Sequence, residues 1–193
     1  SKTINTGLTA GTIYYYRVRS SNSGGLSASY SSLISLTTAP EAPTAGNATS
    51  VGKTTFTANW TASTGATKYF LDVAATSSFD GGTFVSGFQN RDVGNVVTYP
   101  VSGLSRGITY YYRLRAYNSN GTSSDSGTKS ALTIPAEPGV LPATSIQSTG
   151  FSANWNSSTG AASYKLSVST DPAFGGGFVG GYNNFDIGNF TTK

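Results

Sequence analysis

The chain has 193 residues, of which only 10% are charged and 12% are aromatic. It contains no Cys, Met or His, which excludes disulfides, zinc sites built from Cys and His, and the usual His-based catalytic triads. The formal net charge of +4 is the balance of 12 Lys and Arg against 8 Asp and Glu. The cations are scattered along the chain, which argues against nucleic-acid binding because such a surface needs clustered cations.

Residues 1–38 are predicted to form a strand ending near Gly7, a turn, a tyrosine-rich strand, a glycine loop and a last strand over 31–37. The tyrosine-rich stretch alternates, with Tyr14 and Tyr16 on one face and Tyr15 and Arg17 on the other. A period of two predicts a strand with one face in a core and the other in water. No apolar run approaches about 18 residues, so we expect no membrane-spanning helix.

A short linker with two prolines, over 39–43, is expected to be stiff and extended. A full unit follows to about residue 134. Glycines at positions 65, 81, 82, 103 and 121 are expected to mark turns that need positive φ. Seven short strands without a helical period indicate a β-sandwich, and we place them near 45–51, 54–60, 68–75, 83–88, 96–101, 109–118 and 128–134.

The chain repeats itself. The stretch Phe56–Trp60 recurs as Phe151–Trp155, and Tyr69–Val73 recurs as Tyr164–Val168, at an offset of 95 residues. The tyrosine-rich strand of 11–22 also recurs, at 107–118. An offset of this size is the length of one compact domain rather than of a solenoid unit. Residues 139–193, after a second linker at 135–138, repeat only the first half of the central unit.

Trp60, Tyr69 and a leucine six residues before Tyr110 occur together with an Arg-x-Arg-Ala-x-Asn stretch that ends at Asn118. This combination resembles the fibronectin type III pattern. It implies an all-β chain of tandem immunoglobulin-like sandwiches: a C-terminal half domain over 1–38, a complete domain over 39–134 and an N-terminal half domain over 135–193.

The resemblance also implies the core residues and two tyrosine corners. Tyr110 and Tyr14 take the corner role, in which the hydroxyl bonds to backbone near Leu104 or Leu8. The expected core residues are Trp60, Tyr69, Leu104, Tyr110, Tyr112, Leu8, Tyr14, Trp155 and Tyr164. The sequences of residues 84–95 and 178–189 are similar to those of bacterial secreted and cell-surface members of this family. This similarity implies an extracellular spacer, adhesion module or fibre, and we expect no cofactor.

Outward aromatic and basic side chains on the two tyrosine strands form a candidate interface for a protein or a glycan. Aromatic residues and arginines are enriched at interfaces. The alternative is cross-strand pairing on a solvated sheet face, where each pair contributes about 0.2–1 kcal/mol. The candidate interface residues are Tyr15, Arg17, Tyr111, Arg113, Arg115 and Tyr117.

The eight carboxylates form no dense cluster in the sequence. Asp80 and Asp171 lie in predicted turns, where an aspartate accepts hydrogen bonds from its own backbone, and a weak calcium ligand is the alternative. Asp92 and Asp186 occupy equivalent positions before a glycine, which favours a turn role. We therefore expect no catalytic residue, no metal site and no enzymatic activity.

The two half domains expose apolar faces in this interpretation. Tyr14, Tyr16 and Val18 would face water at one end, and Trp155, Tyr164 and Leu166 at the other. Burying such a side chain stabilises by about 1.5–3 kcal/mol, so six exposed ones cost on the order of 10 kcal/mol. The natural chain is then either longer, or completed by strand donation between copies. Closure within one chain is disfavoured because a domain's ends lie at opposite poles.

These features predict a non-catalytic, extracellular filament or stalk that is assembled head to tail. Its expected partners are copies of itself, with a host or matrix protein or a glycan as a further ligand, and neither nucleic acid nor membrane. The alternative function is an adhesive or carbohydrate-binding accessory module of a secreted enzyme.

Overall fold

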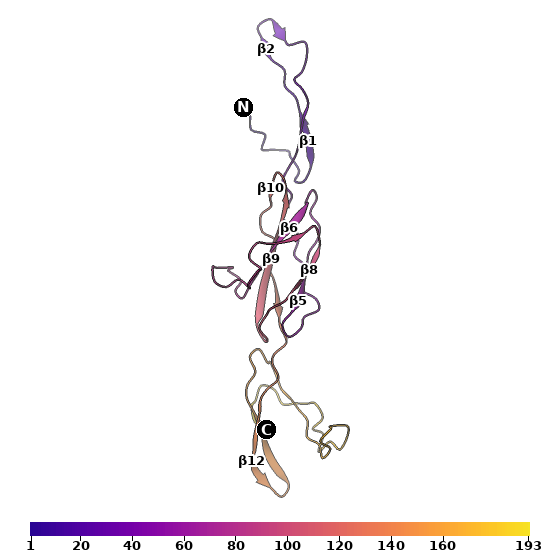
Figure 1. Ribbon diagram of the computed structural model, residues 1–193, viewed down its shortest axis with the longest axis vertical. Helices are drawn as coiled ribbons and strands as arrows, with labels where there is room; N and C mark the ends of the chain where they lie inside the picture. The colour runs from indigo at the N-terminus through magenta and orange to yellow at the C-terminus, as the bar shows by residue number, and fades with distance from the viewer. The chain divides into compact units, whose positions relative to one another are not determined.

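The computed structural model describes residues 1–193 as an all-β chain without a helix (Figure 1). No helix is therefore available to cross a membrane. Its fifteen strands, in chain order, are β1 (Ile13–Tyr16), β2 (Ser21–Asn22), β3 (Gly25–Leu26), β4 (Ile34–Thr37), β5 (Phe56–Asn59), β6 (Lys68–Ala74), β7 (Arg91–Gly94), β8 (Thr98–Val101), β9 (Thr109–Asn118), β10 (Gly121–Thr122), β11 (Lys129–Leu132), β12 (Val140–Gln147), β13 (Gly150–Trp155), β14 (Lys165–Leu166) and β15 (Phe185–Asp186).

The central region contains two sheets. Strands β5 and β8 form one, and isolated bridges from Ala45 to Trp60 and from Thr49 to Thr57 extend it. The other has the order β10-β9-β6-β7, and β11 also pairs with β9. Its longest pairing joins β6 and β9 over seven antiparallel residue pairs, with the two strands side by side in Figure 1. This pairing joins the first half of the central unit, which contains β6, to its second half, which contains β9.

Alternation along β9 builds the core, as its sequence period predicts. Tyr110, Tyr112 and Leu114 are buried, while the residues between them are partly exposed. The ring of Tyr112 lies 5.5 Å from that of Phe56, and its hydroxyl donates a hydrogen bond to the Gly46 carbonyl. One β9 side chain therefore joins both sheets.

Seven of the nine expected core residues are buried: Trp60, Tyr69, Leu104, Tyr110, Tyr112, Trp155 and Tyr164. Tyr14 is half-buried, and Leu8 is exposed, which corrects the core assignment of that leucine. Its repeat counterpart Leu104 is buried in a complete sandwich, whereas residues 1–38 form only two-stranded ribbons, without a second layer. A single ribbon has no facing layer with which to cover a side chain.

The strand expected over 83–88 is wrong. Only Phe84 forms a bridge there, to Ala74, and the strand that pairs with β6 on the side opposite β9 is β7. Gly87 and Asn90 both have positive φ, which turns the chain away from a continuous ladder. The region near 45–51 likewise has only two bridging residues. Of the five turn glycines, only those at 65, 82 and 103 have positive φ; Gly81 and Gly121 do not.

Residues 1–38 form two small ribbons, β1 with β4 and β2 with β3. The Tyr14 hydroxyl accepts a hydrogen bond of 2.7 Å from the Thr9 backbone N–H, next to Leu8, where the tyrosine-corner prediction placed it. Tyr16 and Val18, in contrast, are exposed to solvent. The local motif therefore forms, but its apolar face has no cover.

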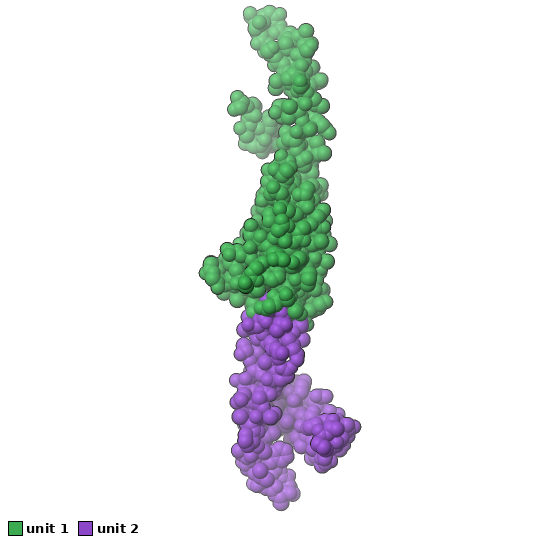
Figure 2. Space-filling view, in the orientation of Figure 1, with its two compact units in different colours: residues 1–51, 55–103, 109–131 green, residues 52–54, 104–108, 132–193 purple.

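Residues 140–193 form the ribbons β12–β13 and β14–β15. Trp155, Tyr164 and Ile187 pack into a small buried cluster, and the Trp155 and Tyr164 rings lie 5.8 Å apart. This corrects the expectation that Trp155 and Tyr164 face water, because residues of the same segment cover them. The segment belongs to the second of two compact units, which Figure 2 distinguishes by colour.

Glu137 of the second linker is held by two cations within that second unit. Lys53 and Arg106 each donate to one of its carboxylate oxygens. The hydrogen bond from Lys53 is the largest cause that lowers the pKa of Glu137 from 4.5 to about 2. Because these groups are exposed, the contact orders the linker locally and contributes little to global stability.

We expect a carboxyl NMR titration of Glu137 to have its midpoint near 2 rather than at the ordinary value of 4.5. A depressed pKa means that the contact is fully present above pH 4.5 and is lost as the pH falls toward 2. The Lys53→Met substitution should return the midpoint toward the ordinary value, and Lys129→Met serves as the control. An unshifted midpoint in the unsubstituted protein would contradict this contact.

Candidate functional site

The outward face of the β6–β9 pair carries most of the candidate interface. Alternation directs Tyr111, Arg113, Arg115 and Tyr117 of β9 away from the core. The pairing register places Asp72 of β6 opposite Arg113. Each outward arginine therefore has a carboxylate, an amide or an aromatic ring from a neighbouring segment within reach.

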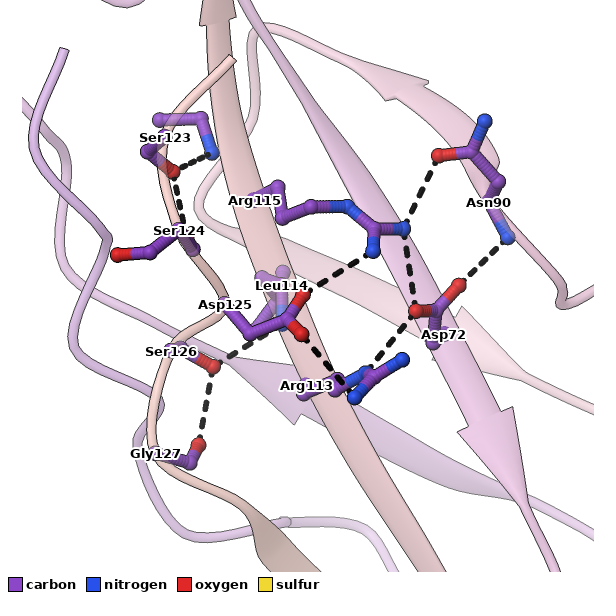
Figure 3. Close-up of polar contacts among 11 residues, drawn as sticks. Asp72, Asn90, Arg113, Leu114, Arg115, Ser123, Ser124, Asp125, Ser126 and Gly127 are labelled. Atoms are coloured by element: carbon purple, nitrogen blue, oxygen red, sulfur yellow. Dashed lines mark hydrogen bonds and ion pairs between the residues drawn. The ribbon is translucent and has the colours of Figure 1, made fainter. Parts of the chain in front are cut away.

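Asp72 is the centre of a charge network on this face (Figure 3). Its carboxylate is almost completely buried, and Oδ2 accepts hydrogen bonds of 3.1 Å from Arg113 Nε and from Arg115 Nη2. Oδ1 accepts a hydrogen bond of 2.6 Å from the Asn90 backbone N–H. Asp125 pairs with the same two arginines from the other side, at 3.0 Å each. Two carboxylates thus neutralise two guanidinium groups.

The network connects elements that are far apart in sequence. Arg115 also donates to the Asn90 side-chain oxygen at 3.0 Å, and the Arg113 guanidinium lies over the Phe79 ring at 4.3 Å. Strands β6 and β9 are thereby joined to the segment before β7 and to the segment after β10. Two of the three guanidinium nitrogens of each arginine have partners inside the chain, so the geometry gives both side chains a structural role on this face.

An aromatic patch lies at one end of the same face. The Phe70 and Tyr117 rings meet edge to face at 5.8 Å, and Lys68 Nζ lies 4.9 Å from each ring centre. Both rings are partly exposed. Tyr111 is separate from this patch, because it lies opposite Ala74 at the other end of the pairing. Partly exposed aromatic rings can stack against another ring or against the apolar face of a sugar.

The equivalent arginines in residues 1–38 have a different partner. Arg17 and Arg19 stack over the Tyr30 ring at 3.7 and 4.8 Å, and Arg19 also donates to the Ser27 carbonyl. Tyr15 beside them is exposed. The structure therefore brings together Arg113 with Arg115 and Arg17 with Arg19, and it leaves the outward tyrosines apart. An interface role for these residues stays a prediction.

The turn carboxylates of Asp171 and Asp92 accept hydrogen bonds from nearby backbone N–H groups, whereas that of Asp80 does not. Asp171 accepts hydrogen bonds of 2.9 Å from the N–H groups of Ala173 and Gly175. Asp92 accepts from Gly94 N–H at 3.0 Å and pairs with Lys68 at 2.7 Å, and the lysine contact is the main cause that lowers its pKa. No group of three or more acidic side chains lies close enough to hold a metal ion.

Asp186 repeats the arrangement of Asp92 one domain length later. It accepts from Gly188 N–H at 2.9 Å and from Lys165 at 2.6 Å, and its pKa is lowered in the same way. Asp80 contributes only its carbonyl, which accepts from the Thr83 hydroxyl and N–H. The repeated geometry supports the turn role that the sequence predicts for Asp92 and Asp186.

Sequence reasoning did not single out Asp72. A signal was present in the sequence. Alternation places Asp72 on the outward face of the strand predicted over 68–75, and it places two arginines on the outward face of the strand predicted over 109–118. The sequence does not give the pairing register between two strands this far apart in the chain, and only that register places Asp72 against Arg113, 41 residues later.

Comparison with known proteins finds the "Fibronectin type III domain" family model over residues 41–131. Exoglucanase B of Cellulomonas fimi is 29% identical over 171 residues, which is 80% of this chain and 15% of that protein. Fibronectin type III domain-containing protein 7 of Mus musculus is 31% identical over 136 residues, 70% of this chain and 17% of that protein.

A Kelch domain-containing protein of Saccharolobus solfataricus is 40% identical over 83 residues, 42% of this chain and 11% of that protein. The chain thus spans less than a fifth of the length of each of these relatives. What is shared is a region the size of one or two domains.

Proposed function

Residues 41–131 are a fibronectin type III domain, and we propose from this that the chain is a non-catalytic accessory module of a secreted carbohydrate-active enzyme. The similarity to Exoglucanase B carries the proposal, because it extends over 80% of this chain and therefore beyond the central domain. Domains of this family are typically extracellular, which agrees with a secreted location.

The chemistry of the face also supports a non-catalytic role. An acid–base pair in a glycosidase needs two carboxyl groups that flank a substrate. Asp72 and Asp125 instead share two arginines, and Asp92 and Asp186 are each paired with a lysine. These four carboxylates are thereby paired with cations inside the chain.

We propose that the module contacts polysaccharide weakly through the patch of Phe70 and Tyr117, with Tyr111 as a second stacking position. The rings are partly exposed, and Lys68 at their edge can donate to hydroxyl groups. This assigns the carbohydrate contact to the outward tyrosines of β9 and leaves the arginines to hold the sheet together.

Affinity electrophoresis in soluble β-glucans, together with sedimentation on insoluble cellulose, tests this function. We expect retardation or co-sedimentation that is lost in a Tyr111→Ala/Tyr117→Ala double variant. Tyr99→Ala is the matched control, because Tyr99 lies on β8 of the other sheet. Binding that survives the double variant, or no binding to any glucan, would contradict the assignment.

A head-to-tail extracellular filament or stalk is the second candidate function. It is favoured by the exposed apolar side chains of residues 1–38 and 140–193, such as Tyr16, Val18, Val140 and Phe151. The intact mass of the native chain distinguishes its two forms. A mass near 19.9 kDa supports completion between separate copies, and a much larger mass supports a tandem array within one polypeptide.

A further inference from the structure

A glycine with positive φ precedes each of the two tyrosine strands, and each of these glycines lies against the backbone of another segment. Gly11 comes shortly before β1, and Gly107 takes the same place before β9. Their φ angles are +62° and +67°. Glycine is favoured where φ is positive and also where two backbones approach closely, so each position has two separate reasons to be glycine.

In the first compact unit, Gly11 meets the turn at residues 63–65 of the central domain. A Cβ atom on Gly65 would lie 2.6 Å from the Gly11 Cα atom, and one on Gly11 would overlap the Thr64 carbonyl oxygen. Gly65 also has a positive φ, of +73°. Neither glycine can therefore carry a side chain unless the two backbones move apart.

The second compact unit contains the same contact one repeat later. The Ser-Thr-Gly turn of residues 63–65 recurs as the Ser-Thr-Gly of residues 158–160. A Cβ atom on Gly160 would again lie 2.6 Å from the Cα atom of its partner, which is Gly107, and one on Gly107 would overlap the Thr159 carbonyl oxygen. Gly160 has a φ of +74°. The close approach is thus a property of the repeat rather than of one place in the chain.

Tyrosine hydroxyls hold the loops that meet. The hydroxyl of the buried Tyr69 accepts a hydrogen bond of 2.8 Å from the Ser63 N–H, and its repeat counterpart Tyr164 accepts the equivalent bond at 2.8 Å. On the other side of the first contact, the Tyr14 hydroxyl accepts from the Thr9 N–H at 2.7 Å. Each loop of the first contact is therefore fixed to a ring of its own segment before the two backbones meet.

The linker beside the first contact is held as well. The Gly11 N–H donates to the Ala39 carbonyl at 2.9 Å. Nδ2 of Asn118, at the end of β9, donates to the Thr38 carbonyl at 2.9 Å and to the Gly65 carbonyl at 3.2 Å. Both prolines of the linker are buried. A linker that acted as a free tether would leave these groups in water.

We propose that the glycine before a tyrosine strand and the Ser-Thr-Gly turn of the following repeat form a docking interface between adjacent repeats of one chain. The partner that fits this interface is backbone, because a side chain at either glycine would prevent the approach. Docking fixes the linker over 39–43 and thereby the orientation of residues 1–38 on the central domain. This inference goes beyond the accessory role and uses no residue of the aromatic patch, so each can fail without the other.

Pulsed electron–electron double resonance of the full chain tests the docking. The chain contains no Cys, so Ser35→Cys and Thr98→Cys place the only two spin labels, on exposed residues of β4 and β8. With both glycines in place we expect one narrow distance peak. Gly11→Ala and Gly65→Ala should each abolish that peak and give a broad distribution, because the added Cβ atom forces the two backbones apart.

Glycines with the same φ but with open space around them are the matched controls. Gly7 and Gly94 have φ angles of +73° and +72°, and a Cβ atom on either would meet no other part of the chain. Gly7→Ala lies in the same segment as Gly11, and Gly94→Ala lies in the central domain. Both carry the cost of positive φ without the collision, so both should keep the narrow peak.

Amide hydrogen exchange of β6 and β9 separates loss of docking from loss of fold. Gly11 lies outside the central domain, so Gly11→Ala should broaden the distances while exchange in these two strands stays unchanged. A broad distribution in the chain with both glycines, or a narrow peak retained by Gly11→Ala or Gly65→Ala, overturns the proposal. Equal broadening by the control substitutions also overturns it, because the effect would then come from φ alone.

Discussion

Replacing Tyr112 with alanine is expected to lower the free energy of unfolding of the central domain by about 3–5 kcal/mol, the usual cost of removing a large buried aromatic side chain. The ring is completely buried against Phe56, and its hydroxyl bonds to the Gly46 carbonyl. Urea denaturation followed by tryptophan fluorescence measures the loss, since Trp60 lies in the same core.

Tyr16→Ala is the matched control for this prediction, because Tyr16 has the same place in the repeated motif. Its side chain is exposed, so the substitution should change the stability of the monomeric chain by no more than about 0.5 kcal/mol. Tyr112→Phe removes only the hydroxyl and should cost about 0.5–1.5 kcal/mol. Equal losses at Tyr16 and Tyr112 would contradict the difference in burial.

Replacing Asp72 with asparagine is expected to destabilise the central domain by about 1–3 kcal/mol, because two arginines lose the buried carboxylate that they share. The side chains of Arg113 and Arg115 are about a quarter exposed, which keeps the cost below that of a fully buried ion pair. Urea denaturation measures the loss, and amide hydrogen exchange at Asn90 should accelerate, since its N–H donates to Asp72.

Asp125→Asn tests the same network at its exposed side. Its carboxylate is more than a third exposed, so we expect a loss of no more than about 1 kcal/mol. Asp72→Ser introduces the residue that the repeat has at position 167 and should behave like Asp72→Asn. If Asp125→Asn were the more damaging substitution, the network would not be centred on Asp72.

By itself, the sequence determined the all-β class, the repeat, the β9 strand with its bounds and the domain family. These follow from local signals: strict alternation, glycine turns and aromatic residues at fixed spacing are readable within one segment. The Tyr14 corner and the backbone contacts of Asp171 are equally local, since each side chain bonds within a few residues of itself.

Only the tertiary structure decided the features that depend on register between distant segments. The strand expected over 83–88 is absent, and β7 pairs with β6 instead on that side. Asp72 lies between two arginines. Residues of their own segment bury Trp155 and Tyr164, whereas Leu8 is exposed. The physical reason is that alternation tells which face a side chain takes, but not which strand lies beside it or whether a second layer covers that face.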